Sequence, residues 1–310
     1  MSDALQDTLH KKLDTVASIA GATKLQRFLR DPVKYFNAVV LREISYKRTQ
    51  AEKSVQSTTF FGADMQLLLP SGTDIYLTGG KSHDSEVRLA RLLVEVLKAG
   101  DSFVDVGAHY GYFTLLASIL VEAGGRVVCI EAAPRTYKVL QQNVAPIANI
   151  SAYNAAISDR EIELKFYEFP NLYSEYNTTD VDQFRNESWF ARYPPKESIV
   201  KGLTLDSFLE KNKVRPTLIK IDVEGAEHQV VGGAVKHLQQ FKPMIVMEYL
   251  SSTRGNRPHV QAAKSLLALG YEQYCIDAKG GLSAVEDVEQ HLCAQQLDSD
   301  NIVFVAQQHG

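Results

Sequence analysis

Apolar positions repeat with helical spacing at the start of the chain. They recur every three or four residues: Leu5, Leu9, Leu13, Val16 and Ala20. This spacing predicts an amphipathic helix, and Gly21 is a suitable residue to end it. A second helix is predicted after Asp31 and Pro32, which form a cap followed by a first-turn proline.

The next segment alternates between apolar and polar residues. Residues 58–77 have this pattern and contain Pro70, Ser71 and Gly72, so they predict a β-hairpin that turns at these three residues. Residues 85–97 return to helical spacing and predict a helix with one apolar face.

From residue 101 onward, short apolar runs alternate with helical patterns. The runs predict eight strands at 102–106, 126–131, 151–155, 162–168, 217–222, 244–249, 271–276 and 302–306. The helices are predicted at 114–122, 137–143, 206–211, 226–241 and 260–269. Apolar strands separated by helices are typical of parallel β-α-β units with right-handed crossovers. The sequence therefore predicts a doubly wound α/β sheet.

Residues 169–200 interrupt this alternation and have no clear periodicity. They are rich in aromatic residues: Phe169, Tyr173, Tyr176, Trp189, Phe190 and Tyr193. A long loop inside a compact domain is usually a lid or a binding element. The alternative, a disordered surface insertion, is disfavoured by this aromatic content.

A glycine turn at 101–114, DSFVDVGAHYGYFT, is the strongest chemical signal. A buried strand ends at Asp105, and Gly107 and Gly111 lead into a helix, which is where open α/β sheets bind nucleotides. Glu131 ends the next strand, 20 residues beyond Gly111, where its carboxylate can accept hydrogen bonds from both ribose hydroxyls.

Nicotinamide and flavin enzymes also use such turns. Here the spacing is Gly-x-x-x-Gly, and the carboxylate of Asp105 would repel a pyrophosphate. A carboxylate instead attracts the sulfonium and ammonium groups of S-adenosylmethionine. The turn also lacks a lysine for phosphate, which argues against a nucleotide triphosphate site.

Six motifs in order make the resemblance specific. They are DVGAHYGYFT (105–114), CIEAAP (129–134), NAAISD (154–159), TLDSFL (204–209), LIKIDVEGAE (218–227) and VMEY (246–249). This series resembles the FkbM-type methyltransferases, a family with a seven-stranded class I S-adenosylmethionine fold. The resemblance covers roughly the C-terminal three quarters of the chain. Residues 1–57 therefore form a separate N-terminal helical region in this interpretation, and 58–310 form the methyltransferase domain.

The resemblance also implies cofactor contacts. Ala108, His109 and Ala132 lie within its motifs, and Asn154 and Ala155 are expected at the edge of the adenine. His109 stands where many members have asparagine, which could alter one contact. Glu86 could reach the methionine ammonium or be an ordinary solvated helix residue.

The motif KIDVEGAE places carboxylates at a strand end that faces the same crevice. An alcohol acceptor must lose a proton during methyl transfer, so Asp222 and Glu224 are candidate bases, followed by His228 and Glu248. Asp222 could instead contact only the cofactor or cap a helix, and His228 could be a surface residue. Asp222 and Glu248 could hold a magnesium ion, but no metal motif supports this, and no metal is assigned.

Charge changes the picture at the N-terminus. The chain of 310 residues has a net charge of −4, yet residues 1–60 carry ten basic and six acidic residues, or +4. Residues 24–53 interleave basic and apolar residues, which is typical either of a helix that contacts an anionic membrane or of a helix docked on its own domain. The N-terminal helices could also form a homo-oligomer. The acidic remainder argues against nucleic acid as a substrate.

Three cysteines without metal spacing fit a reducing cytoplasm, and no apolar run is long enough to span a bilayer. The resemblance implies O-methylation of a hydroxyl on a sugar, glycan or secondary metabolite. N-methylation, a non-catalytic scaffold that retains the fold, and a nicotinamide oxidoreductase remain the alternatives.

Overall fold

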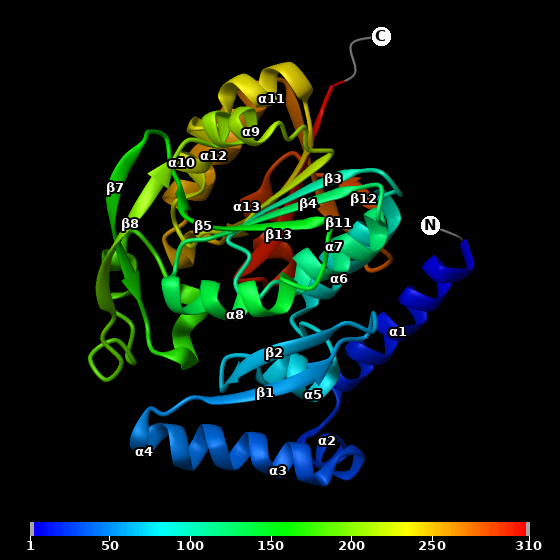
Figure 1. The fold of residues 1–310 in the computed structure, drawn as a ribbon, viewed down its shortest axis with the longest axis vertical. Helices are drawn as coiled ribbons and strands as arrows, with labels where there is room; N and C mark the ends of the chain where they lie inside the picture. The colour runs from blue at the N-terminus through cyan, green and yellow to red at the C-terminus, as the bar shows by residue number, and fades with distance from the viewer. Residues whose placement is uncertain (1–2, 308–310) are drawn as a thin grey trace.

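An eight-stranded sheet forms the centre of the computed structural model, which describes residues 3–307 (Figure 1). Its order is β12-β11-β13-β10-β9-β3-β4-β5. The strands are β3 (Ser102–Val106), β4 (Arg126–Glu131), β5 (Ile150–Asn154), β9 (Leu218–Ile221), β10 (Met244–Leu250), β11 (Tyr271–Ile276), β12 (Leu282–Ala284) and β13 (Ser299–Ala306).

The central strand β3 pairs in parallel with β4 on one side and with β9 on the other. Strand β13 is antiparallel to both of its neighbours, and β12 is antiparallel to β11. The predicted doubly wound α/β fold is confirmed. Seven of the predicted strands lie in this sheet, and the short β12 adds an eighth strand that was not predicted.

Helices cover both faces of the sheet and enclose a separate apolar core on each side. They are α6 (Asp84–Val96), α7 (Tyr112–Val121), α8 (Pro134–Val144), α9 (Leu205–Asn212), α10 (Glu227–Gly232), α11 (Val235–Phe241), α12 (Arg257–Ala268) and α13 (Val288–Gln295). The single helix predicted at 226–241 is wrong, because the chain breaks at Gly233. A Cβ there would lie 2.1 Å from the carbonyl oxygen of Ser158, so only glycine allows this approach.

The N-terminal region begins with α1 (Asp3–Gly21), which packs against α6. Leu9, Leu13 and Val16 of α1 are buried in the same core as α6. The chain continues through α2 (Lys24–Arg30), α3 (Pro32–Val40), the π-helix η1 (Leu41–Tyr46) and α4 (Lys47–Thr49). Asp31 caps α3 as predicted, because its side chain accepts a hydrogen bond from the Lys34 amide at 2.9 Å.

A β-hairpin follows, but it lies earlier in the chain than predicted. Strand β1 (Lys53–Thr58) pairs with β2 (Asp64–Leu69), and the turn is at 59–63. Residues 73–77, expected in the second arm, belong to helix α5 (Thr73–Thr78) instead. The boundary drawn after residue 57 therefore falls inside β1.

The aromatic-rich insertion is ordered and packs on its own residues. It contains the 3-10 helices η2 (Asn171–Tyr176) and η3 (Val181–Phe184). Phe169, Val181 and Phe184 form a buried cluster against which Trp189 packs. Residues 196–200, assigned to the insertion, belong to β8 (Lys196–Leu203), which pairs with β6 (Ala156–Ile157) and β7 (Ile162–Glu168) in a second sheet.

The remaining short element is the 3-10 helix η4 (Ser252–Arg254), which follows β10. Among the helices formed by residues 3–307, none is long and apolar enough to cross a bilayer.

Candidate active site

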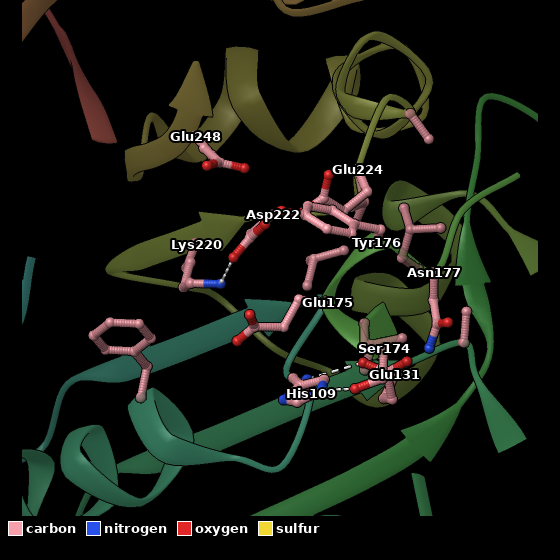
Figure 2. Close-up of a pocket in the computed structure, with 18 of the residues that line it drawn as sticks. His109, Glu131, Ser174, Glu175, Tyr176, Asn177, Lys220, Asp222, Glu224 and Glu248 are labelled. Atoms are coloured by element: carbon pink, nitrogen blue, oxygen red, sulfur yellow. Dashed lines mark hydrogen bonds and ion pairs between the residues drawn. The ribbon is translucent and has the colours of Figure 1, made fainter. Parts of the chain in front are cut away.

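A cavity of about 320 Å³ opens at the carboxyl ends of the central strands. Residues at or just beyond the ends of β3, β4, β9, β10 and β13 form its floor, and α6 and η2 supply the opposite wall. Figure 2 shows Asp222, Glu224 and Glu248 toward one end of this space and His109 and Glu131 toward the other. This is the position at which open α/β sheets bind their ligands.

Glu131, at the end of β4, lines the cavity as expected. Its two carboxylate oxygens accept hydrogen bonds from the backbone amides of His109 and Ala133, each at 2.9 Å. These bonds fix the carboxylate and leave a lone pair on each oxygen for a diol. Burial raises the pKa of Glu131 to about 7, although both amides lower it.

The two glycines of the turn allow close packing within the protein more than they make room for the ligand. Gly107 has φ +82°, and a Cβ there would lie 1.7 Å from the carbonyl oxygen of Asp222. Gly111 has φ +88° and begins α7 close to Leu140. Among the described residues that line the cavity, Gly107 is present, whereas Gly111 and Ala108 are not.

His109 has a left-handed backbone with φ +49° and lines the cavity. Its Nε2 lies 3.1 Å from the Ser174 hydroxyl of η2. Burial lowers the pKa of His109 to about 4, so the imidazole is neutral at physiological pH. The ring therefore joins the turn to the insertion as a hydrogen-bonding group without charge.

Ala132 and Ala155 line the cavity next to Glu131, as expected. Asn154 supports this wall from behind and is not among the described lining residues. Its Nδ2 donates to the carbonyl oxygens of Glu131 and Ala132, at 2.8 and 3.0 Å. Asn154 thus fixes the turn after β4.

Asp105 lies beneath the floor of the cavity and is buried. It accepts a 2.6 Å hydrogen bond from the Thr114 hydroxyl, and its other oxygen lies 3.7 Å from Nζ of Lys220. Lys220 separates it from Asp222, whose Oδ2 is 3.0 Å from the same Nζ. Burial lowers the pKa of Lys220, but the carboxylates of Asp222 and Asp105 outweigh it and raise the pKa overall.

Three carboxylates converge at the other end of the cavity. Oxygens of Asp222, Glu224 and Glu248 all lie within 4.8 Å of one another. Burial raises the pKa of Glu248 to about 8. Burial and the nearby carboxylates of Glu248 and Asp222 raise the pKa of Glu224 well above its ordinary value. Carboxylate oxygens are also the ligands that Mg²⁺ prefers, so these are the described residues that could hold a metal.

Side chains of the insertion hold the backbone of Glu224 in a left-handed conformation. Its φ is +53°, and its carbonyl oxygen accepts hydrogen bonds from Thr178 Oγ1 at 2.7 Å and Gln183 Nε2 at 2.8 Å. Both donors belong to the insertion, which therefore helps to shape the carboxylate cluster. His228, a weaker candidate base on α10, is not among the described residues that line the cavity.

Glu86, at the start of α6, lines the wall opposite the cluster. Its Oε1 lies 3.1 Å from Nζ of Lys81, which also pairs with Glu175 of η2. Glu86 is therefore an ion-paired cavity residue, and it is positioned to meet an ammonium group.

Trp189 and Tyr176 occupy different surroundings within the insertion. Tyr176 lines the cavity, whereas Trp189 is not among the described lining residues. Trp189 stacks on Tyr173 with ring centroids 4.0 Å apart and contacts Phe169. Within the predicted lid or binding element, Tyr176 therefore faces the cavity, whereas the indole of Trp189 packs inside the aromatic cluster.

Comparison with known proteins agrees with this arrangement. The Methyltransferase FkbM domain family matches residues 105–273, more than half of the chain, and this range contains strands β4, β5, β9 and β10 of the sheet that bears the cavity. The chain belongs to the FkbM methyltransferase family. It is therefore an S-adenosylmethionine-dependent methyltransferase.

Two curated methyltransferases are similar to this FkbM methyltransferase. "Methyltransferase 1" of Beauveria bassiana is 29% identical over 199 residues, which cover 60% of this chain and 74% of that protein. "Methyltransferase sdnD" of Sordaria araneosa is 25% identical over 191 residues, covering 54% and 72%. A solved FkbM methyltransferase from Methylobacillus flagellatus is 16% identical with a TM-score of 0.44, covering 87% of this chain and 60% of that one.

Several residues of the FkbM site were missed from sequence: Lys81, Glu175 and Lys220. Lys220 carried a usable signal, because a lysine inside the apolar run LIKI must be buried and paired. Lys81 and Glu175 carried none, because their pairing depends on α6, η2 and the loop between α5 and α6 meeting in three dimensions.

Proposed function

We propose that this methyltransferase transfers a methyl group to a hydroxyl group on a sugar, glycan or secondary metabolite. The observation that carries the proposal is the convergence of Asp222, Glu224 and Glu248 at one end of the cavity. A hydroxyl acceptor must lose a proton as its oxygen attacks, and a carboxylate within hydrogen-bond reach can accept that proton.

Glu224 is the best candidate for the base within this cluster. The ammonium of Lys220 donates a hydrogen bond to one oxygen of Asp222. This ion pair orients Asp222 and makes its carboxylate a weaker proton acceptor. Glu224 has no such cation among the described residues within ion-pair distance, and its raised pKa makes the carboxylate a stronger proton acceptor. Asp222 then positions the acceptor or the methyl donor.

The other end of the cavity fits S-adenosylmethionine. The fixed carboxylate of Glu131 suits the two ribose hydroxyls, and Ala132 and Ala155 provide a narrow apolar edge for the adenine. Glu86 and Lys81 could accept the ammonium and the carboxylate of the methionine end. When bound, the donor supplies an electrophilic methyl group on a sulfonium, a charge that the carboxylate cluster favours.

The insertion supplies the acceptor side. Tyr176 lines the cavity and is backed by Trp189, whose ring centroid is 5.6 Å away with nearly parallel planes. An aromatic face supported in this way suits a sugar ring or another flat apolar acceptor. Positioning between this face and the cluster would supply much of the rate acceleration.

The test is to incubate the purified protein with S-adenosylmethionine labelled in its methyl group and a fractionated cell extract. We expect a labelled product that mass spectrometry identifies as a methyl ether. The matched control is Glu224→Gln, which keeps the shape of the side chain and should form far less product. A labelled N-methyl product would overturn the proposed acceptor class.

A further inference from the structure

Helices α2 and α3 and the π-helix η1 present a continuous apolar face that their own domain leaves uncovered. Within the described chain, its large side chains are well exposed: Leu25 65%, Leu29 67%, Val33 70%, Phe36 62% and Ile44 63%. Phe28 and Val39, at 39% and 40% exposed, extend the same face. Monomeric soluble proteins rarely expose so many large apolar side chains together, so the face indicates an interaction surface.

The opposite side of these helices explains why the apolar face points outward. Ala38 and Tyr46 are buried, and the Tyr46 hydroxyl accepts a 3.1 Å hydrogen bond from the Leu172 amide of η2. Arg192 donates to the carbonyl oxygen of Lys47 at 3.0 Å. Figure 1 shows α3 and α4 running along the end of the molecule farthest from α11, below β1. The helices are thus docked through one side, and the apolar side is free.

The segment that bears the apolar face also carries an excess of basic residues. Residues 24–53 contain eight Lys or Arg and three Asp or Glu, a net charge of +5, whereas the whole chain has −4. Lys24, Arg30, Arg42, Lys47 and Arg48 are exposed, and Glu43 pairs with two of them, Arg42 and Lys47, leaving a net excess of positive charge. A large exposed apolar surface combined with an excess of exposed cations is typical of helices that lie in the interface of anionic bilayers.

We propose that residues 24–48 dock this methyltransferase on an anionic membrane surface, with the apolar side chains in the headgroup boundary and the cations on lipid phosphates or carboxylates. A second copy of the chain is the competing occupant. In a dimer formed through this face, the basic residues of one copy would lie close to those of the other, and like charges across an interface cost free energy. Anionic headgroups neutralise them instead. This inference concerns where the enzyme works and does not rest on the identity of the methyl acceptor.

The experiment uses the full chain and two kinds of vesicle, phosphatidylcholine alone and phosphatidylcholine mixed with phosphatidylglycerol. We expect the protein to sediment with the mixed vesicles and not with the neutral ones, and high salt should weaken the binding. Leu29→Asp combined with Phe36→Asp should abolish it. Arg30→Gln combined with Arg42→Gln should weaken it about tenfold to thirtyfold, because each basic residue near the surface adds to the attraction.

Leu267→Asp is the matched control, because Leu267 is also exposed (42%) but lies on α12, away from this face. It should bind vesicles like the wild type. Affinity for S-adenosylhomocysteine should be unchanged in all variants, which shows that they fold. Equal binding to both vesicles, binding that survives Leu29→Asp with Phe36→Asp, or no vesicle binding together with a dimer that this pair dissociates, would each overturn the proposal.

Discussion

Glu131 and Glu224 show how one residue type can serve two tasks at the residue scale. Backbone amides fix both oxygens of Glu131 beside the turn after β4. Glu224 instead faces two other carboxylates, and burial with this like charge raises its pKa. The first environment favours recognition of a ligand, and the second favours proton transfer.

Glu131→Ala should weaken binding of S-adenosylhomocysteine by at least about tenfold to a hundredfold, because losing even one of its two charged hydrogen bonds to the ribose costs roughly 1.5–3 kcal/mol. Affinity in the wild type should also rise with pH through about 7, because the ionised carboxylate is the better acceptor and burial raises its pKa to that value. Calorimetry across this range measures both. Glu163→Ala, on the exposed side of β7, is the control, and equal affinities for the two variants would contradict the role of Glu131.

Glu224→Gln should lower turnover about a hundredfold to ten-thousandfold, because the amide cannot accept the proton. Wild-type turnover should increase with pH, since the raised pKa keeps the Glu224 carboxyl protonated at lower pH. Steady-state kinetics measure both effects. In Asp222→Asn, the ammonium of Lys220 loses the negative charge that lies 3.0 Å away, so KM should change as well. Full turnover in Glu224→Gln would exclude Glu224 as the base.

Much of the candidate site could be anticipated from the sequence, because strand ends fix where side chains meet. Glu131, Asp222 and Glu224 follow apolar runs, and the structure brings them to one cavity. Asp105 followed the same rule but lies beneath the floor, because Lys220 in the adjacent strand separates it from the cavity. A strand pattern gives the edge at which a residue lies, whereas the depth of its side chain depends on its cross-strand neighbours.

At the scale of elements, Gly107 allows the ends of β3 and β9 to approach each other closely. A Cβ at this position would lie 1.7 Å from the carbonyl oxygen of Asp222, just after β9. Gly107→Ala should therefore destabilise the fold strongly. Gly100→Ala is matched, because Gly100 also has positive φ (+90°) but no atom within 4 Å of the added Cβ. It should cost only about 1–2 kcal/mol of backbone strain. Urea unfolding compares the two, and equal losses would reject the steric explanation.

The insertion allows a second comparison between elements. Tyr176→Ala should raise the acceptor KM and leave cofactor affinity nearly unchanged, because Tyr176 lines the cavity. Trp189→Ala should lower the stability of the insertion by about 1–3 kcal/mol, because it removes the partner stacked on Tyr173. Kinetics with the identified acceptor and thermal unfolding separate these effects. A rise in KM for Trp189→Ala without loss of stability would instead indicate that Trp189 contacts the acceptor directly.

Helices and strands could be predicted from the sequence where apolar residues followed a clear periodic pattern. They were harder to predict where a turn determined the structure. All eight predicted strands and α6 were found, whereas the hairpin was displaced because its turn at 59–63 was interpreted as strand. Gly62, with φ +89°, marked that turn. Strand β8 was missed because its partner β7 lies across a long insertion, and this pairing has no local signal.

At the scale of the whole molecule, the N-terminal region has two unlike parts, one integral to the core and one facing outward. Leu13 of α1 is fully buried beside α6, and Arg91 of α6 bonds to Asp14 at 2.6 Å. Leu29 of α2 is 67% exposed. Leu13→Ala should therefore lower the free energy of unfolding by about 2–5 kcal/mol, the cost of a core cavity.

The same substitution at Leu29 should change stability by less than about 0.5 kcal/mol, as at most surface positions. Urea denaturation of the two variants, with cofactor affinity measured alongside, compares the same change of side chain at two depths. If α1 were only an appendage, Leu13→Ala would unfold at the wild-type midpoint. If the face that contains Leu29 were covered by a second copy in solution, Leu29→Ala would lose stability in a way that depends on protein concentration, because dimer stability follows mass action. A loss confined to Leu13 makes α1 part of the methyltransferase core and leaves α2 free for a partner outside the chain.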